Sequence, residues 1–215
     1  MAGWRLTKSL PTSGSNNMRL DEQLFLDHEE GNNLSTLRIY AWDPPCVSFG
    51  YSQEIKKELI PKGWEAVKRP TGGGIVFHNL SEVTYSIVTD LNAFGEKLIP
   101  SYIKISKAIV AGLQKLGIKA EVSEGENSNS RRNDLCFSYP AEYEIVFAGR
   151  KLVGSAQKRG KRTLLQQGSI LVKDDENSYP AEAITIEEIL GRVPAFDEIA
   201  DALKQGFTER LNCEF

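Results

Sequence analysis

Three consecutive glycines mark the first segment whose residue types are suited to chemistry. Gly72, Gly73 and Gly74 stand between two strand-like runs, with Arg69 before them and His78 after them. Because glycine has no Cβ, such a loop lets the backbone approach a ligand and present N–H groups to a carboxylate, phosphate or thioester oxygen. The loop matches neither a Walker loop nor a dinucleotide-binding fingerprint. A bulged hairpin turn that binds no ligand is the alternative interpretation.

A single lysine among small residues marks the second segment. Lys151 lies at the mouth of a predicted hairpin, and Gly154, Ser155 and Ala156 leave its surroundings uncrowded. A lysine in such a place can neutralise a phosphate or polarise a carbonyl group. The alternative is a lysine that protects a sheet edge from pairing with another chain.

Cys136 is the third candidate, and it follows a polar segment at residues 123–134 that contains two arginines and no apolar residue. We expect this segment to be a mobile loop. A thiol near cations has a lowered pKa and can act as a nucleophile, whereas a thiol in an apolar strand is inert. Cys46 and Cys213 have no such setting, and we interpret both as structural.

These candidates are carried by a chain rich in strands, with helices spaced irregularly among them. The spacing of apolar residues predicts a helix after Asn16-Asn17, helices over residues 101–116 and 196–211, strands over residues 36–42, 46–51, 64–68, 83–89 and 164–172, and a hairpin over residues 142–157 that turns at Ala148-Gly149. Gly117 is expected to end its helix, and Thr185 with Glu188 forms a capping-box pattern. The order favours an α+β fold over regular βαβ alternation.

Composition excludes several classes of protein. The chain has 215 residues, with 26 Lys and Arg against 29 Asp and Glu, and its formal net charge is −3. This balance gives no overall attraction to nucleic acid or to an anionic membrane, and the basic residues 158–162 are interpreted as a solvated loop. His28 is likewise expected to be solvated. There is no apolar signal segment, disulfide framework or zinc spacing, so we predict a cytoplasmic protein that binds no nucleic acid, no membrane and no metal.

Five segments in order resemble the catalytic domain of the lipoate-protein ligase, octanoyltransferase and biotin-protein ligase superfamily. They are NNMRLDEQLFL, LRIYAWDPPCVSFGYSQ, VKRPTGGGIVFHNLSEVTYSIV, RRNDLCFSYPAEYEIVFAGRKLVGSAQKR and LLQQGSILV. The resemblance implies an α+β fold with mixed and antiparallel sheets and packed helices, similar to class II aminoacyl-tRNA synthetases and biotin synthetases. It also implies one catalytic domain over residues 1–215, without a C-terminal accessory domain.

The resemblance also implies a set of site residues. Cys136 and Lys151 would be catalytic, and the residues that bind the acyl group or its adenylate would be Arg69, Gly72, Gly73, Gly74, Val76, His78, Asn133, Asp134, Gly154, Ser155 and Ala156. The resemblance implies that Lys151 holds its charge at the acyl carbonyl, so Lys151→Ala should abolish acylation of a lipoyl domain and leave the thermal unfolding midpoint within a few degrees.

Two enzymatic branches and one non-catalytic alternative stay open. Cys136 followed by phenylalanine, E-V-T-Y-S and G-S-A-Q-K-R resemble octanoyltransferases, which move octanoyl from acyl carrier protein through a cysteine thioester without a cofactor. The intact glycine loop and R-N-D-L resemble ligases that use free lipoate, ATP and Mg²⁺, although Pro70 and Gln167 depart from the ligase pattern. We favour the transferase. In both branches the acceptor would be a lipoyl-domain protein, either glycine-cleavage H protein or a 2-oxoacid dehydrogenase E2. The third possibility is a non-catalytic acyl-binding paralogue.

Overall fold

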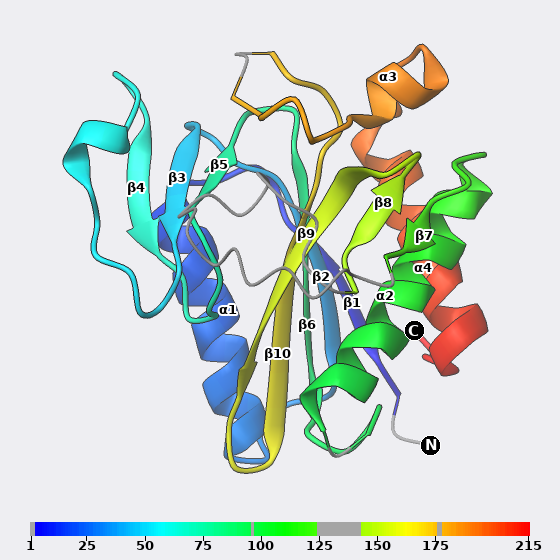
Figure 1. The fold of residues 1–215 in the computed structure, drawn as a ribbon. Coiled ribbons are helices and arrows are strands. Elements are labelled where there is room, and N and C mark those ends of the chain that lie inside the picture. Colours follow the sequence, from blue (N-terminus) through cyan, green and yellow to red (C-terminus); the bar gives the residue numbers. More distant parts are fainter. Residues whose placement is uncertain (1–2, 96, 124–142, 176–177) are drawn as a thin grey trace.

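The computed structural model describes residues 3–95, 97–123, 143–175 and 178–215. Within these residues the strands form two sheets (Figure 1). The large sheet has the order β1 (Arg5–Lys8), β2 (Thr36–Tyr40), β6 (Val83–Asp90), β10 (Thr163–Ile170), β9 (Arg150–Arg159), β8 (Ile145–Phe147) and β7 (Glu121–Val122). The small sheet has the order β4 (Glu65–Lys68), β3 (Cys46–Phe49) and β5 (Val76–His78). Only β1–β2 and β3–β4 pair in parallel among these strands, so the predicted α+β class is confirmed.

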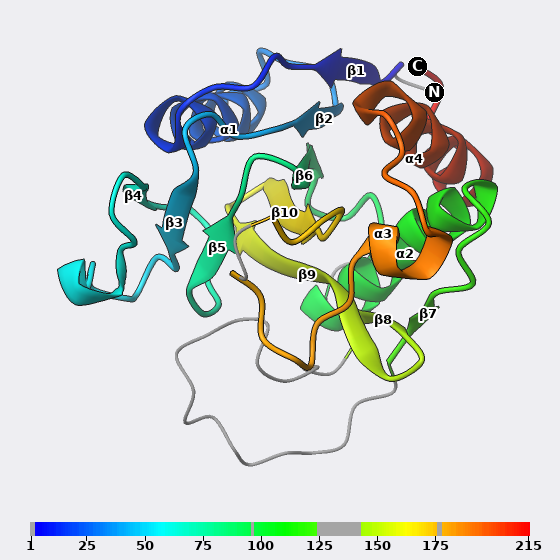
Figure 2. The same cartoon turned by 90° about the horizontal axis from the view of Figure 1, so that it is seen from above.

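Helices cover both faces of the large sheet. Figure 2 shows α2 (Leu98–Lys115) and α4 (Phe196–Leu211) on one side, and α1 (Gly14–Glu29) with the small sheet on the other. The main apolar core fills the space between the sheet and the α2–α4 pair. A Cβ on Gly206 would lie 2.3 Å from the carbonyl oxygen of Ala108, so this glycine allows the two helices to pack closely. A 3₁₀ turn, η1 (Lys57–Leu59), and a short helix, α3 (Ile186–Leu190), complete the described elements.

Local signals in the sequence predicted several features correctly. Gly117 ends α2 with a φ of +85°, and the hairpin turns at Ala148 and Gly149 with φ values of +49° and +77°. Thr185 and Glu188 form the expected capping box at the start of α3. Residues 196–211 form the closing helix with the predicted limits. The predicted mobile loop lies outside the described residues from residue 124 onward.

Two predictions near α1 are wrong because the side chains concerned form hydrogen bonds with distant parts of the chain. Ser13, and not Asn16-Asn17, caps the helix, and the Ser13 side chain accepts a hydrogen bond from the backbone N–H of Asn16. The Asn17 amide is buried and donates to the carbonyl of Ala41 at 3.0 Å. His28 is also buried, its Nδ1 lies 3.0 Å from Thr163 Oγ1, and burial lowers its pKa. No described helix is long and apolar enough to cross a membrane.

Candidate active site

A cavity lies between the two sheets beside α1. The large sheet and its flanking segments contribute a wall that includes Trp42 and Gln167, and the small sheet contributes Ser48 and His78. The full lining consists of Met18, Tyr40, Trp42, Ser48, Arg69, Thr71, Val76, His78, Thr84, Gly154, Ser155, Ala156, Gln167, Gly168 and Ser169. The fold therefore brings together six of the predicted site residues, which are Arg69, Val76, His78, Gly154, Ser155 and Ala156.

The glycine loop is held from one side by Arg69. The Arg69 Nη2 donates to the carbonyl of Gly72 at 2.7 Å and to the carbonyl of Gly74 at 2.5 Å, and its Nε donates to Gly72 at 3.1 Å. Gly73 has a φ of +88°, a conformation that favours glycine. Gly50 must also lack a side chain, because a Cβ there would lie 2.1 Å from the carbonyl oxygen of Gly73. Arg69 therefore fixes the position of the glycine loop through these hydrogen bonds.

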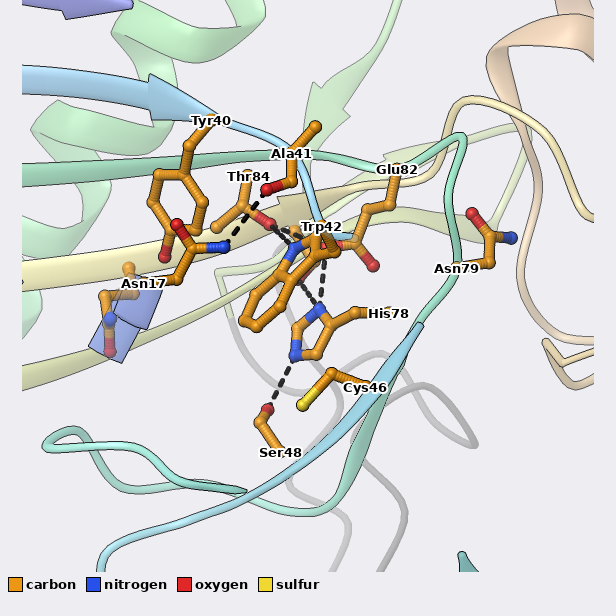
Figure 3. Close-up of polar contacts among 12 residues, drawn as sticks. Asn17, Tyr40, Ala41, Trp42, Cys46, Ser48, His78, Asn79, Glu82 and Thr84 are labelled. Atoms are coloured by element: carbon orange, nitrogen blue, oxygen red, sulfur yellow. Dashed lines mark hydrogen bonds and ion pairs between the residues drawn. The ribbon is translucent and has the colours of Figure 1, made fainter. Parts of the chain in front are cut away.

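His78 belongs to a buried polar network in the cavity wall, and Figure 3 shows this network. Its Nε2 lies 2.7 Å from Ser48 Oγ, and its Nδ1 lies 2.7 Å from Glu82 Oε1. The imidazole stacks on the indole of Trp42 with ring centroids 3.9 Å apart. The indole N–H donates to Thr84, and the Thr84 hydroxyl donates to the same Glu82 oxygen at 2.7 Å. Both ring nitrogens of His78 therefore have partners inside the protein.

Asp21 is the acceptor at the centre of a second buried network on the α1 side. Its two carboxylate oxygens accept hydrogen bonds from Arg38 at 2.8 Å, Tyr40 at 2.9 Å, Ser86 at 2.7 Å and Gln167 at 2.6 Å. Burial and then the charge of Asp21 raise the pKa of Tyr40 well above its ordinary value, so the phenol stays protonated and donates. Because its polar groups bond to one another, this cavity wall can face an alkyl chain without leaving them unsatisfied.

Lys151 is completely buried and forms an ion pair with Glu144. The pairing of β8 with β9 shifts here, because Ile145 pairs with Val153 and Val146 pairs with Lys151. Leu152 is thus the extra residue of a β-bulge, a feature that redirects the side chains beside it. Lys151 bridges in parallel to Ala183, which packs with Val76 of the cavity wall.

The expected open setting of Lys151 is therefore wrong. Its side chain has no exposed surface, and its ammonium group is paired with the carboxylate of Glu144. Lys151 is also not among the residues that line the cavity. Removing this lysine would take away the ion-pair partner of the buried Glu144 carboxylate. This revises the expectation that Lys151→Ala would leave the thermal unfolding midpoint almost unchanged.

The described cysteines lie in apolar surroundings. Cys46 and Cys213 are buried, and burial raises the pKa of each thiol to about 12. Both are therefore thiols at neutral pH, in agreement with a structural role. Cys136, Asn133 and Asp134 lie outside the described residues. Among the described residues no three His, Cys, Asp or Glu side chains gather as a metal site.

Sequence reasoning missed four residues that the structure places in these networks. Ser48, Glu82, Asp21 and Glu144 are buried, and each bonds to a residue that lines the cavity or to Lys151. A usable signal existed for the acids, because Glu82 precedes an apolar strand and Asp21 lies among the apolar residues of a helix. Ser48 gave no such signal.

The chain combines an α+β fold of two sheets with a cavity between them and a glycine loop that Arg69 holds. The sequence model of the Lipoyl protein ligase A/B catalytic domain matches residues 13–208, so the chain belongs to this family. The chain is 37% identical over 240 residues to the octanoyltransferase LipM of Moorella thermoacetica, a match that covers 99% of this chain and 88% of that protein. It is 35% identical over 244 residues to the octanoyltransferase LipM of Bacillus subtilis, covering 97% of this chain and 86% of that protein.

Solved structures agree on the fold. A lipoate-protein ligase A bound with ATP superposes with a TM-score of 0.81 at 26% identity, and the match covers 100% of this chain and 87% of that chain. A biotin protein ligase from Aquifex aeolicus superposes with a TM-score of 0.56 at 16% identity, covering 99% of this chain and 71% of that chain. The predicted resemblance to this superfamily, and the fold class that it implied, are confirmed.

Proposed function

We propose that this protein is an octanoyltransferase that moves an octanoyl group from octanoyl-acyl carrier protein to a lysine of a lipoyl-domain protein in the cytoplasm. The observation that carries the proposal is the 37% identity to an octanoyltransferase over 99% of the chain. Glycine-cleavage H protein and the E2 subunit of a 2-oxoacid dehydrogenase are the acceptors to test. This reaction needs no cofactor.

The proposed chemistry runs in two steps through Cys136. In the first, the Cys136 thiolate attacks the thioester carbonyl carbon, a new S–C bond forms, and the bond to the phosphopantetheine sulfur breaks. The departing thiol takes up the proton that Cys136 released. In the second, the lysine amine attacks the same carbonyl carbon, a C–N amide bond forms, the C–S bond to Cys136 breaks, and the proton from nitrogen returns to the Cys136 sulfur. Covalent catalysis of this kind divides one transfer into two easier steps.

We assign two roles in this chemistry, one to Lys151 with the glycine loop and one to the cavity. Lys151 and the glycine-loop N–H groups are the groups we assign to the developing oxyanion, and each such donor contributes about 3–4 kcal/mol at comparable sites. Lys151 belongs to the bulged strand and forms an ion pair with Glu144. The cavity between the sheets would take the alkyl chain, where each buried CH₂ contributes about 0.8 kcal/mol.

Intact-protein mass spectrometry tests the proposal. Incubation with octanoyl-acyl carrier protein, in the absence of ATP, should add one octanoyl mass to the wild-type protein and none to Cys136→Ala. Hydroxylamine should release the adduct, as it does other thioesters. Cys213→Ala is the matched control, because this buried thiol lies in the α2–α4 core and should leave acylation unchanged.

The ligase reaction is the alternative outcome of the same experiment. A solved structure with the same fold contains ATP, which keeps this reaction in view. If Cys136→Ala still modifies a lipoyl domain when it is given lipoate, ATP and Mg²⁺, the transferase proposal is wrong and the protein is a ligase. If neither set of substrates gives a modified acceptor, the protein binds acyl groups without transferring them.

A further inference from the structure

A continuous path of hydrogen bonds runs from Glu82 to the glycine loop. Glu82 bonds to His78, His78 bonds to Ser48, and the Ser48 hydroxyl lies 3.0 Å from Arg69 Nη1. Arg69 then reaches the carbonyls of the loop through its other two nitrogens. All four side chains are buried, with exposed fractions of 7% or less. We name these four residues the Glu82–Arg69 relay.

The chemistry of the donor sets the direction of the hydrogen bond between Arg69 and Ser48. A guanidinium only donates, so Ser48 Oγ accepts from Arg69. The same Ser48 oxygen lies 2.7 Å from His78 Nε2, and Nδ1 of that ring lies 2.7 Å from Glu82 Oε1. Arg69 Nη1 also donates to the backbone carbonyl of Ser48 at 3.1 Å, so the guanidinium is anchored to β3 at two points.

The relay determines which way the glycine-loop peptides face. In a trans peptide the C=O and the following N–H point in opposite directions. The carbonyls of Gly72 and Gly74 point to Arg69, so the N–H groups of Gly73 and Ile75 point away from it. A rotated guanidinium would release these carbonyls, and the N–H groups would lose their fixed direction.

We propose that Ser48, His78 and Glu82 are positioning residues that act through Arg69 to orient the glycine-loop N–H groups toward the acyl oxygen. The inference rests on the proposed function and goes beyond it. His78 lines the cavity as the sequence predicted for an acyl-binding residue, and the proposal adds an indirect role, since both of its ring nitrogens are engaged inside the protein. Glu82 does not line the cavity, and it reaches the cavity wall through His78 and through Thr84.

Single-turnover acylation of Cys136 by octanoyl-acyl carrier protein tests the relay. Ser48→Ala should lower the maximal acylation rate about 10- to 100-fold, as small misplacements of catalytic groups do, while the donor concentration at half-maximal rate changes less than twofold. Glu82→Gln should lower the rate in the same direction. Hydrogen exchange of the peptide that spans residues 69–76 should become faster in both variants, because the loop loses its anchor.

Ser101→Ala is the matched control. Ser101 is a buried serine of α2 that donates to the carbonyl of Leu98 at 2.8 Å, and it belongs neither to the relay nor to the residues that line the cavity. Its acylation rate and its exchange over residues 69–76 should stay within twofold of the wild-type values. This control separates a general loss of buried hydrogen bonding from loss of the relay.

Each of the following outcomes would contradict either the proposed function or the role of the relay. If the wild-type protein forms no octanoyl adduct, the proposed function fails, and the role of the relay in orienting groups toward an acyl oxygen fails with it, whereas faster exchange over residues 69–76 in Ser48→Ala would still show that the relay anchors the loop. If the wild-type protein is acylated and Ser48→Ala is equally fast, the relay does not position the loop. A Ser48→Ala variant that changes only the half-maximal concentration would make Ser48 part of the binding wall. An octanoyl ester on Ser48 in the Cys136→Ala protein would show that Ser48 reacts itself, and it would also overturn the positioning role.

Discussion

Replacing Lys151 by methionine should destabilise the folded protein strongly, although methionine has a similar length and shape. The Lys151 side chain has no exposed surface, and Glu144 is 4% exposed. Removing one partner of a buried ion pair costs about 3–5 kcal/mol, because the remaining charge keeps its desolvation cost. For a chain of this size, 1 kcal/mol lowers the melting temperature by about 2–4 °C, so the midpoint should fall by about 6–20 °C.

Urea unfolding of four proteins measures this loss and assigns it to the pair. The wild type, Lys151→Met, Glu144→Gln and the double variant form a double-mutant cycle. The double variant should regain more than half of the stability lost in Lys151→Met, because no net charge is then left in the buried site. Acylation of Cys136 should stay absent in both proteins that lack Lys151, which separates the catalytic role of the ammonium from its structural role.

Two results would refute this reasoning. A loss below 1 kcal/mol in Lys151→Met would mean that the ion pair is hydrated in solution, since exposed pairs contribute about that much or less. A double variant as unstable as Lys151→Met would mean that shape, and not charge, makes Lys151 important for folding.

Two further predictions concern the cysteines and one tightly packed glycine. At pH 8 a thiol whose pKa is about 12 is about 0.01% thiolate, so Cys46 and Cys213 should resist iodoacetamide in the native protein and react after unfolding, and rapid native labelling of either would contradict its burial. Gly168→Ala should lower stability by about 1–3 kcal/mol in urea unfolding, because the new Cβ would lie 2.3 Å from a ring carbon of Tyr85. Gly3→Ala is its control, since a Cβ there meets nothing within 4 Å, and equal stability of the two variants would rule out the clash.

The sequence predicted best those features that depend on neighbouring residues. The turn at Ala148 and Gly149, the capping box at Thr185 and the limits of α4 each follow from a pattern a few residues long. The helix-start prediction at Asn16-Asn17 failed because it considered neighbouring residues alone. A cap is a local feature, but the Asn17 side chain bonds to the carbonyl of Ala41, which follows β2 and is 24 residues away in the sequence.

In the site, too, neighbouring residues were predictable, and contacts between residues far apart in the sequence were not. Arg69 and His78 stand next to the glycine loop in the sequence, so their inclusion in the site was predictable. Their roles were not, because Ser48 joins them only when β3 pairs with β5. The burial of Lys151 also escaped prediction, since its ion pair with Glu144 forms across a hairpin whose register is shifted by one residue.

The bulge in β9 decides toward which face of the sheet Lys151 points. Side chains along a strand alternate between two faces, so adding or removing one residue exchanges the faces for everything beyond it. Because of the bulge, Lys151 lies opposite Val146 and faces away from Val153 and Ser155. A relative that kept the residue corresponding to Leu152 but paired these strands without the bulge would turn its lysine toward the face where Ser155 meets Tyr85. In comparisons within this family, the pairing register of this hairpin therefore carries as much functional information as the identity of the lysine itself.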